Sequence, residues 1–172
     1  VDIEELKRLI REDTILVSVV DVDSELGLVQ PVEEIAKLLK DYPHIYFHTD
    51  ATQAIGKVTI DYKDIDLITI APHKFYGING IGILIKKKDV SLVPIINGGK
   101  STTIYRSGTP VTASIAAAER ALDIALTNQD ERNKHVKELH DIVINHLKKY
   151  DFIHINNTEK SVPFTINFSI KG

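Results

Sequence analysis

Apolar residues at the beginning of the chain recur at intervals of three and four among charged residues. Ile3, Leu6, Leu9 and Ile10 share one face at this spacing, which predicts a short helix. The β-branched run that follows, residues 14–20, is bounded by acidic residues and predicts a buried strand. The chain therefore begins with a helix followed by a strand.

A second helix is predicted over residues 31–42. Pro31 suits the first position of a helix, carboxylates follow it in the first turn, and the apolar residues between 32 and 39 form one stripe. Short apolar runs at 45–48 and 67–70 predict two further strands. Strands that alternate with helices in this way favour a parallel sheet.

The later apolar runs extend this pattern. Residues 83–85 and 92–96 are predicted to continue the sheet. Residues 112–126 are predicted to form a helix that turns Ile115, Ala118, Leu122 and Ala125 inward. After a polar stretch at 128–130, amphipathic spacing predicts a long helix that leads to strands near 152–155 and 164–168.

We therefore predict an α/β protein with two parts. Residues 1–128 are expected to form a three-layer α/β/α domain with a mostly parallel sheet. Residues 129–172 are expected to begin a smaller α+β domain, which is incomplete because the chain stops just after a predicted strand.

Composition and charge exclude several classes of protein. With 43% hydrophobic and 26% charged residues, the chain has the composition of an ordinary globular domain. A formal net charge of −3 without a basic face argues against a nucleic-acid partner. The longest apolar stretch, residues 15–20, is too short to span a membrane, and we expect a cytoplasmic protein with no membrane partner.

The absence of cysteine limits the chemistry within these residues. With no cysteine, the chain has no disulfide, no thiolate metal site and no cysteine nucleophile. The four histidines between 135 and 154 lack the i, i+4 spacing with a nearby carboxylate that helical zinc motifs have, so no metal site is predicted. Because methionine is also absent and the chain begins at Val1, we expect an excised segment of a longer protein.

Candidate chemistry lies directly after two of the predicted strands. Asp50 follows the strand at 45–48, and His73 and Lys74 follow the strand at 67–70. Ligands of open parallel sheets bind beyond the carboxyl ends of the strands, so these side chains are expected to face one site. His48, two residues before Asp50, is predicted to be a hydrogen-bonded histidine near the strand end rather than a ligand.

An amine and a carboxylate at one rim suit a specific chemistry. A lysine in a partly desolvated crevice loses proton affinity and can condense with an aldehyde cofactor. A carboxylate against a pyridinium nitrogen keeps the ring protonated, which makes the ring an electron sink. Lys74 and Asp50 fit these two roles. Taken singly, Lys74 is more simply interpreted as a solvated surface lysine. Asp50 is more simply interpreted as a turn or cap residue.

Four short segments carry a resemblance to a known family. They are Asp-Ala-Thr-Gln at 50–53, Ala-Pro-His-Lys-Phe-Tyr-Gly at 71–77, Gly-Ile-Gly at 80–82 and Arg-Ser-Gly-Thr-Pro at 106–110. In this order and spacing, the chain resembles the group I cysteine desulfurases, which are fold-type I pyridoxal-phosphate enzymes of the class V aminotransferase superfamily. Residues 23–31 resemble a further segment of that family.

The resemblance implies a cofactor, a reaction and partners. It implies that Lys74 binds pyridoxal 5'-phosphate covalently, Asp50 pairs with the ring nitrogen, Gln53 hydrogen-bonds the phenolic oxygen and His73 contacts the phosphate. It further implies that Thr109 reaches the phosphate of the other subunit of a homodimer. The implied reaction converts L-cysteine to L-alanine and passes sulfur as a persulfide to an acceptor protein, for iron–sulfur cluster or thiolated-tRNA synthesis.

The chain departs from the family pattern at several positions. Ser24 replaces an asparagine that touches the ring, and Ala71 and Pro72 remove two potential phosphate donors. The resemblance places other cofactor-binding residues upstream, and the persulfide-forming cysteine and a carboxylate-binding arginine downstream. We therefore expect that these residues alone cannot turn over cysteine.

Two alternatives remain at the level of the sequence. One is another class V enzyme, such as a selenocysteine lyase or an aminotransferase, because the chain contains few residues that would recognise the side chain of a substrate. The other is a non-catalytic scaffold paralogue, in which the changes at Ser24, Ala71 and Pro72 have ended cofactor binding. Cofactor binding by Lys74 separates the scaffold from the enzymes.

Overall fold

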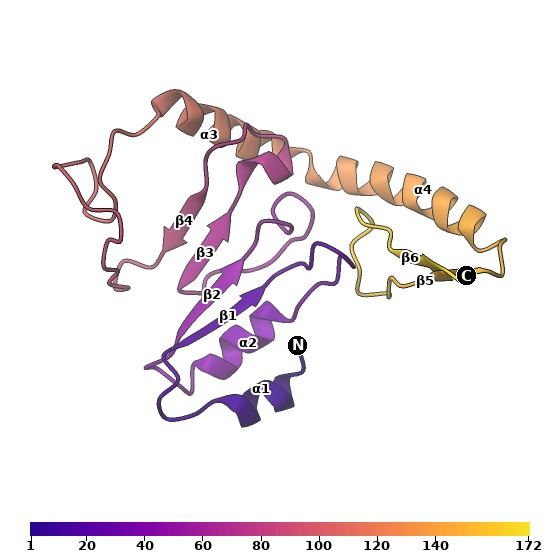
Figure 1. Cartoon of the computed structure of the whole chain (residues 1–172), viewed down its shortest axis with the longest axis horizontal. Coiled ribbons are helices and arrows are strands. Elements are labelled where there is room, and N and C mark those ends of the chain that lie inside the picture. Colours follow the sequence, from indigo (N-terminus) through magenta and orange to yellow (C-terminus); the bar gives the residue numbers. More distant parts are fainter.

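The computed structural model describes residues 1–172 and shows a sheet with helices at its side and end, continued by a long helix and a small second sheet (Figure 1). The helices are α1 (Ile3–Leu9), α2 (Val32–Leu39), the 3-10 helix η1 (Pro72–Phe75), α3 (Thr112–Thr127) and α4 (Gln129–Leu147). The strands are β1 (Leu16–Val20), β2 (Tyr46–Asp50), β3 (Leu67–Ile70), β4 (Ile83–Lys86), β5 (Ile153–Ile155) and β6 (Phe168–Ile170).

The main sheet has the order β1-β2-β3-β4. β1, β2 and β3 are parallel to one another, whereas β4 runs antiparallel to β3, with Ile68 opposite Ile85. β4 reverses direction because residues 71–82 contain only the short η1 and no helix that could carry the chain back along the sheet. The predicted α/β class with a mostly parallel sheet is confirmed.

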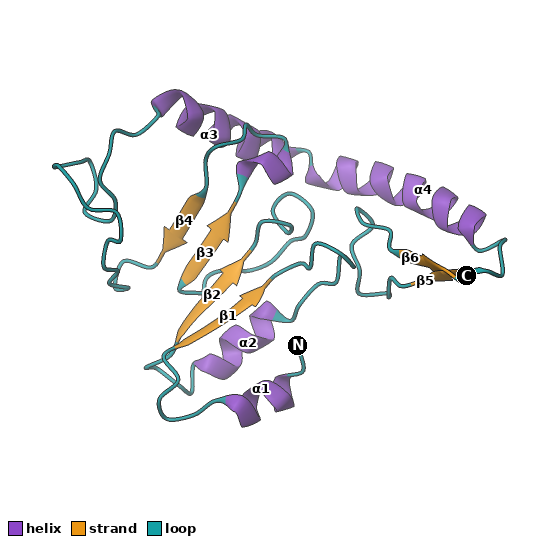
Figure 2. Cartoon of the chain, viewed as in Figure 1, coloured by secondary structure: helices purple, strands orange, loops and turns teal.

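The strand predicted at residues 92–96 is wrong. These residues form no ladder with the sheet, and the connection from residue 87 to residue 111 is loop throughout (Figure 2). Pro94 has no amide hydrogen to donate in the middle of the run, which disfavours a strand. Val93 and Ile95 are 88% and 93% exposed, so the apolar composition of this run does not reflect burial within the chain.

The hydrophobic core lies against one face of the sheet. Val17, Phe47 and Ile68 point to that face from three neighbouring strands and are buried. The apolar stripe of α2 covers them, and α1 lies outside α2 (Figure 1). Successive residues of a strand point to opposite faces, so Leu16 and Tyr46 point away from α2 and are exposed.

The predicted division near residue 128 coincides with a break between two helices. α3 ends at Thr127 and α4 begins at Gln129. Beyond α4, β5 and β6 pair antiparallel. Strand β6 begins at Phe168, later than predicted, because the Asn167 amide donates to the side chain of Asn157 instead of to a ladder. The proposed domain boundary stays a prediction.

The segment after β5 returns to the first sheet. The Asn157 side chain donates to the carbonyl oxygen of Leu26 at 2.9 Å, and the Val162 amide donates to the carbonyl of Gly27 at 2.8 Å. Gly27 adopts φ +65°, and a Cβ there would lie 3.0 Å from the Cβ of Thr165. The segment after β5 therefore holds the loop that follows β1.

No helix in the chain combines the length and the apolar character that crossing a membrane requires.

Candidate functional site

Asp50 and Lys74 lie at the same edge of the main sheet. β2 and β3 are parallel neighbours, with Asp50 opposite Thr69. Asp50 is the last residue of β2, and Lys74 follows the end of β3 by four residues, within η1. The carboxyl ends of parallel neighbours meet at one edge, so the topology brings the two residues to one rim, as the sequence predicts.

The carboxylate of Asp50 is held by the turn that follows it. Its Oδ1 atom accepts a hydrogen bond from the Thr52 amide at 2.9 Å, and the side chain is half-buried. The backbone carbonyl of Asp50 accepts from the Asp21 amide at 2.9 Å. The second carboxylate oxygen makes no hydrogen bond within the chain, so it is free to pair with a ligand.

Gln53 lies one helical turn before Lys57 in the segment after β2. The Lys57 ammonium donates to the Gln53 Oε1 atom at 2.8 Å. Burial lowers the pKa of Lys57, and the charge of nearby Lys74 lowers it further. This second amine was not anticipated from the sequence, because a lysine in a loop gives no local sign that it will be half-buried beside another lysine.

The 3-10 helix η1 presents His73 and Lys74 to solvent. Its first and last residues, Pro72 and Phe75, are buried and anchor it, whereas the two residues between them are exposed. Tyr76 ends the helix in the left-handed conformation, with φ 69°. The Lys74 amine has no ion-pair or hydrogen-bond partner in the chain and is available to a ligand.

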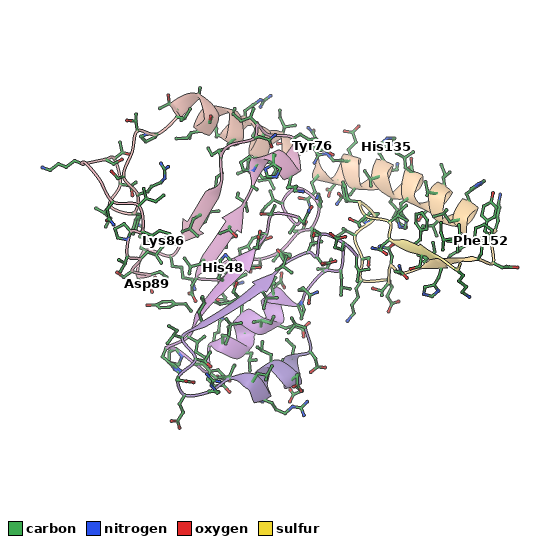
Figure 3. The ribbon with its side chains drawn as sticks, viewed as in Figure 1. His48, Tyr76, Lys86, Asp89, His135 and Phe152 are labelled. Carbon is green, nitrogen blue, oxygen red and sulfur yellow. The ribbon has the colours of Figure 1, made fainter.

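Tyr76 also connects η1 with the beginning of α4. The Arg132 guanidinium lies 5.2 Å from the centroid of the Tyr76 ring, and Figure 3 shows Tyr76 near the start of α4. Such a contact between a guanidinium and an aromatic face is attractive. The contact between Tyr76 and Arg132 therefore links the segment that carries Lys74 to α4.

Thr109 lies apart from the other four predicted site residues. It lines an open hollow of about 890 Å³ between residues 80–84, residues 101–111 and α3. None of Asp50, Gln53, His73 and Lys74 lines this hollow. Thr109 was expected to act in the site of another subunit, and that role stays a prediction.

His48 is hydrogen-bonded on both ring nitrogens, as predicted. Its Nδ1 atom lies 2.7 Å from the Ser18 hydroxyl, and its Nε2 atom lies 3.1 Å from the Thr69 hydroxyl. These three residues come from β1, β2 and β3 and alternate with buried Val17, Phe47 and Ile68, so they point to the face that α2 does not cover. The chain contains no cluster of three or more His, Cys, Asp or Glu side chains that could hold a metal.

Asp21 is a buried carboxylate that the sequence analysis overlooked. It follows β1 directly, is fully buried, and its Oδ2 atom accepts from the Tyr62 hydroxyl at 2.6 Å. Burial raises the pKa of Asp21 from 3.8 to about 6, although the Tyr62 hydrogen bond opposes the rise. The rule that drew attention to Asp50, an acidic residue directly after a strand, applies to Asp21 as well and could have found it.

The donor set at the rim fits a pyridoxal phosphate ring. A half-buried carboxylate with one free oxygen suits a protonated ring nitrogen, and a free primary amine suits an aldehyde. Gln53 adds an amide whose NH₂ group makes no hydrogen bond within the chain. Asp50, Gln53 and Lys74 would hold such a cofactor, which would supply an electron sink for the substrate α-carbon.

Comparison with known proteins gives one consistent result. The family model described as aminotransferase class V matches residues 1–172. The cysteine desulfurase IscS of Dictyoglomus turgidum is 36% identical over 98% of this chain and 44% of its own length. The mitosomal cysteine desulfurase of Encephalitozoon cuniculi is 40% identical over 98% of this chain and 40% of its own length.

Solved structures agree with these relatives. A structure titled NifS-like protein superimposes with a TM-score of 0.93 at 35% identity, covering 99% of this chain and 47% of that one. A structure titled SspA in complex with cysteine superimposes with a TM-score of 0.80 at 29% identity. The chain spans less than half the length of these relatives. With a family model matched from its first residue to its last, the chain belongs to the class V aminotransferase family.

Proposed function

We propose that this chain carries the lysine-bearing part of a pyridoxal-phosphate-dependent cysteine desulfurase. The observation that carries the proposal is the meeting of Asp50 and Lys74 at one rim, at the carboxyl ends of parallel strands. The relatives named cysteine desulfurase support the choice of reaction. One structural relative is titled as a complex with cysteine, which supports cysteine as the substrate.

Each residue at the rim has a defined task in this proposal. The Asp50 carboxylate holds the proton on the ring nitrogen, and Gln53 donates to the phenolic oxygen. His73 donates to the phosphate. Lys74 would hold the cofactor and would move a proton at the substrate α-carbon. The cofactor would supply the electron sink.

The persulfide step needs a thiol from outside these residues, since the chain contains no cysteine. We therefore infer that these 172 residues alone do not form alanine from cysteine over several turnovers. A homodimer, in which Thr109 reaches the partner's site, and a sulfur-acceptor protein complete the proposed system. Sustained alanine formation by the isolated chain would contradict the inference.

Covalent trapping of the cofactor tests the proposal. The complete natural protein that carries these residues is incubated with pyridoxal phosphate, reduced with borohydride, digested and examined by mass spectrometry. We expect a pyridoxyl adduct on Lys74 and a visible absorbance band before reduction. Lys74→Ala should abolish both, whereas Lys88→Ala, which removes another exposed lysine, should change neither.

The outcomes separate the candidate functions. No band and no adduct on Lys74 would refute the enzyme and favour a scaffold that has lost its cofactor. A Lys74 adduct with release of alanine from cysteine supports the desulfurase. An adduct together with activity only on selenocysteine or on another amino acid would assign a different class V reaction.

A further inference from the structure

Lys57 occupies a defined place beside the proposed cofactor site. The segment after β2 turns through hydrogen bonds from the Ala54 amide to the Ala51 carbonyl and from the Lys57 amide to the Ala54 carbonyl, each 2.9 Å long. This turn places Lys57 beside Gln53, and the Lys57 ammonium donates to Gln53 Oε1 at 2.8 Å. The Asn133 side chain donates to the Lys57 carbonyl at 2.8 Å and holds the turn from α4.

The contact fixes which end of the Gln53 amide faces outward. An ammonium group has three donors and no acceptor, so only the oxygen of the amide can face it. The NH₂ group of Gln53 therefore points elsewhere, and it makes no hydrogen bond within the chain. The NH₂ group of Gln53 is thus free to donate to a ligand.

The surroundings of Lys57 are unusual for a purely structural lysine. No carboxylate lies within ion-pair distance of its ammonium, which lies 5.7 Å from the centroid of the Phe164 ring. Burial lowers the pKa of Lys57, and the charge of nearby Lys74 lowers it further. Holding a half-buried ammonium beside a like charge costs free energy, and the contacts with Gln53 and Phe164 offset only part of this cost.

We propose that Lys57 is a positioning residue that holds the Gln53 amide as a donor toward an anionic oxygen of the ligand. The inference rests on the proposed function, in which this oxygen is the phenolic oxygen of the pyridoxal ring. Lys57 acts through Gln53 and does not contact the ligand. Phe164, from the segment after β5, helps to keep the ammonium in place.

Orientation of the amide is tested first without the cofactor. The mobility of the Gln53 side-chain NH₂ group is measured by NMR relaxation in the apoprotein. We expect the group to be ordered in the wild type and in Lys57→Arg, and disordered in Lys57→Met, which has similar length but no donor. An equally ordered amide in Lys57→Met would overturn the proposal, whether or not the cofactor binds.

Cofactor binding gives the second test. In the complete protein, Lys57→Met should weaken the affinity for pyridoxal phosphate about tenfold, as expected for loss of a charge-assisted hydrogen bond. It should also change the ratio of the visible to the near-ultraviolet band of the bound cofactor, and Lys57→Arg should restore both. Lys137→Met, which removes a lysine that likewise bonds a side chain four residues away, should leave both unchanged.

A double-mutant cycle shows whether Lys57 acts through Gln53. If it does, Lys57→Met should add less than a twofold loss of affinity in a Gln53→Ala background. Independent, fully additive losses would refute the positioning role. A wild type with an ordered Gln53 amide but no Lys74 adduct would refute the proposed function and leave the amide orientation established, so the two failures are distinguishable.

Discussion

Alanine in place of Gly77 is expected to lower the free energy of unfolding by about 2 kcal/mol, within the range found for overpacking at sites that cannot relax. A Cβ at residue 77 would lie 2.8 Å from the Cβ of Pro72 and 2.9 Å from its carbonyl oxygen. Pro72 is buried, and the Gly77 amide donates to that same carbonyl at 2.8 Å. Neither partner can move without displacing η1.

The same substitution should reduce the reaction of Lys74 with pyridoxal phosphate, because η1 carries Lys74. Urea denaturation measures the stability, and the borohydride adduct on Lys74 measures the second effect. Gly82→Ala is the matched control, since a Cβ there meets nothing within 4 Å and the residue has no positive φ. Equal stability of the two variants would show that a Cβ at residue 77 does not clash with Pro72.

Asparagine in place of Asp21 is expected to remove a pH dependence of stability. The pKa of Asp21 is about 6 in the folded protein and 3.8 as its ordinary value. The folded state therefore binds the proton more tightly than the unfolded state does. The stability contributed by protonated Asp21 is fully present below about pH 4 and is lost as the pH rises through 6.

The size of this effect follows from the difference in pKa. The rise of the Asp21 pKa from 3.8 to about 6 corresponds to about 3 kcal/mol of unfolding free energy, most of it lost between about pH 4 and pH 7. Asp21→Asn should flatten that part of the profile and be at least as stable as the wild type at neutral pH. Thermal or urea unfolding across this pH range measures it.

Two further variants sharpen the assignment to Asp21. Tyr62→Phe removes the hydrogen bond that lowers the pKa of Asp21, so its transition should move to higher pH. Asp61→Asn removes an exposed carboxylate and should leave the loss of stability near pH 6 in place. If the free energy of unfolding of the wild type stays constant from about pH 4 to pH 7, burial does not raise the pKa of Asp21 and this explanation is wrong.

The candidate site could be anticipated in part because its residues follow a topological rule. Asp50 ends one strand and Lys74 follows the next, and parallel neighbours deliver such residues to one edge. The contacts among the residues at that edge obey no such rule. The Lys57 ammonium contacts Gln53 and the ring of Phe164, and the charge of Lys74 lowers its pKa; of these three residues only Gln53 is near Lys57 in the sequence.

The sequence specified the α/β class and most of the helices and strands, and it predicted that Asp50 and Lys74 follow neighbouring strands. Apolar periodicity and turn chemistry are local, and the rule for parallel strands needs only their order. Tertiary structure alone decided the direction of β4, the exposure of residues 92–96, the burial of Asp21 and the place of Lys57. Strand direction and desolvation depend on what packs alongside, and a local pattern of apolar residues carries no information about those distant neighbours.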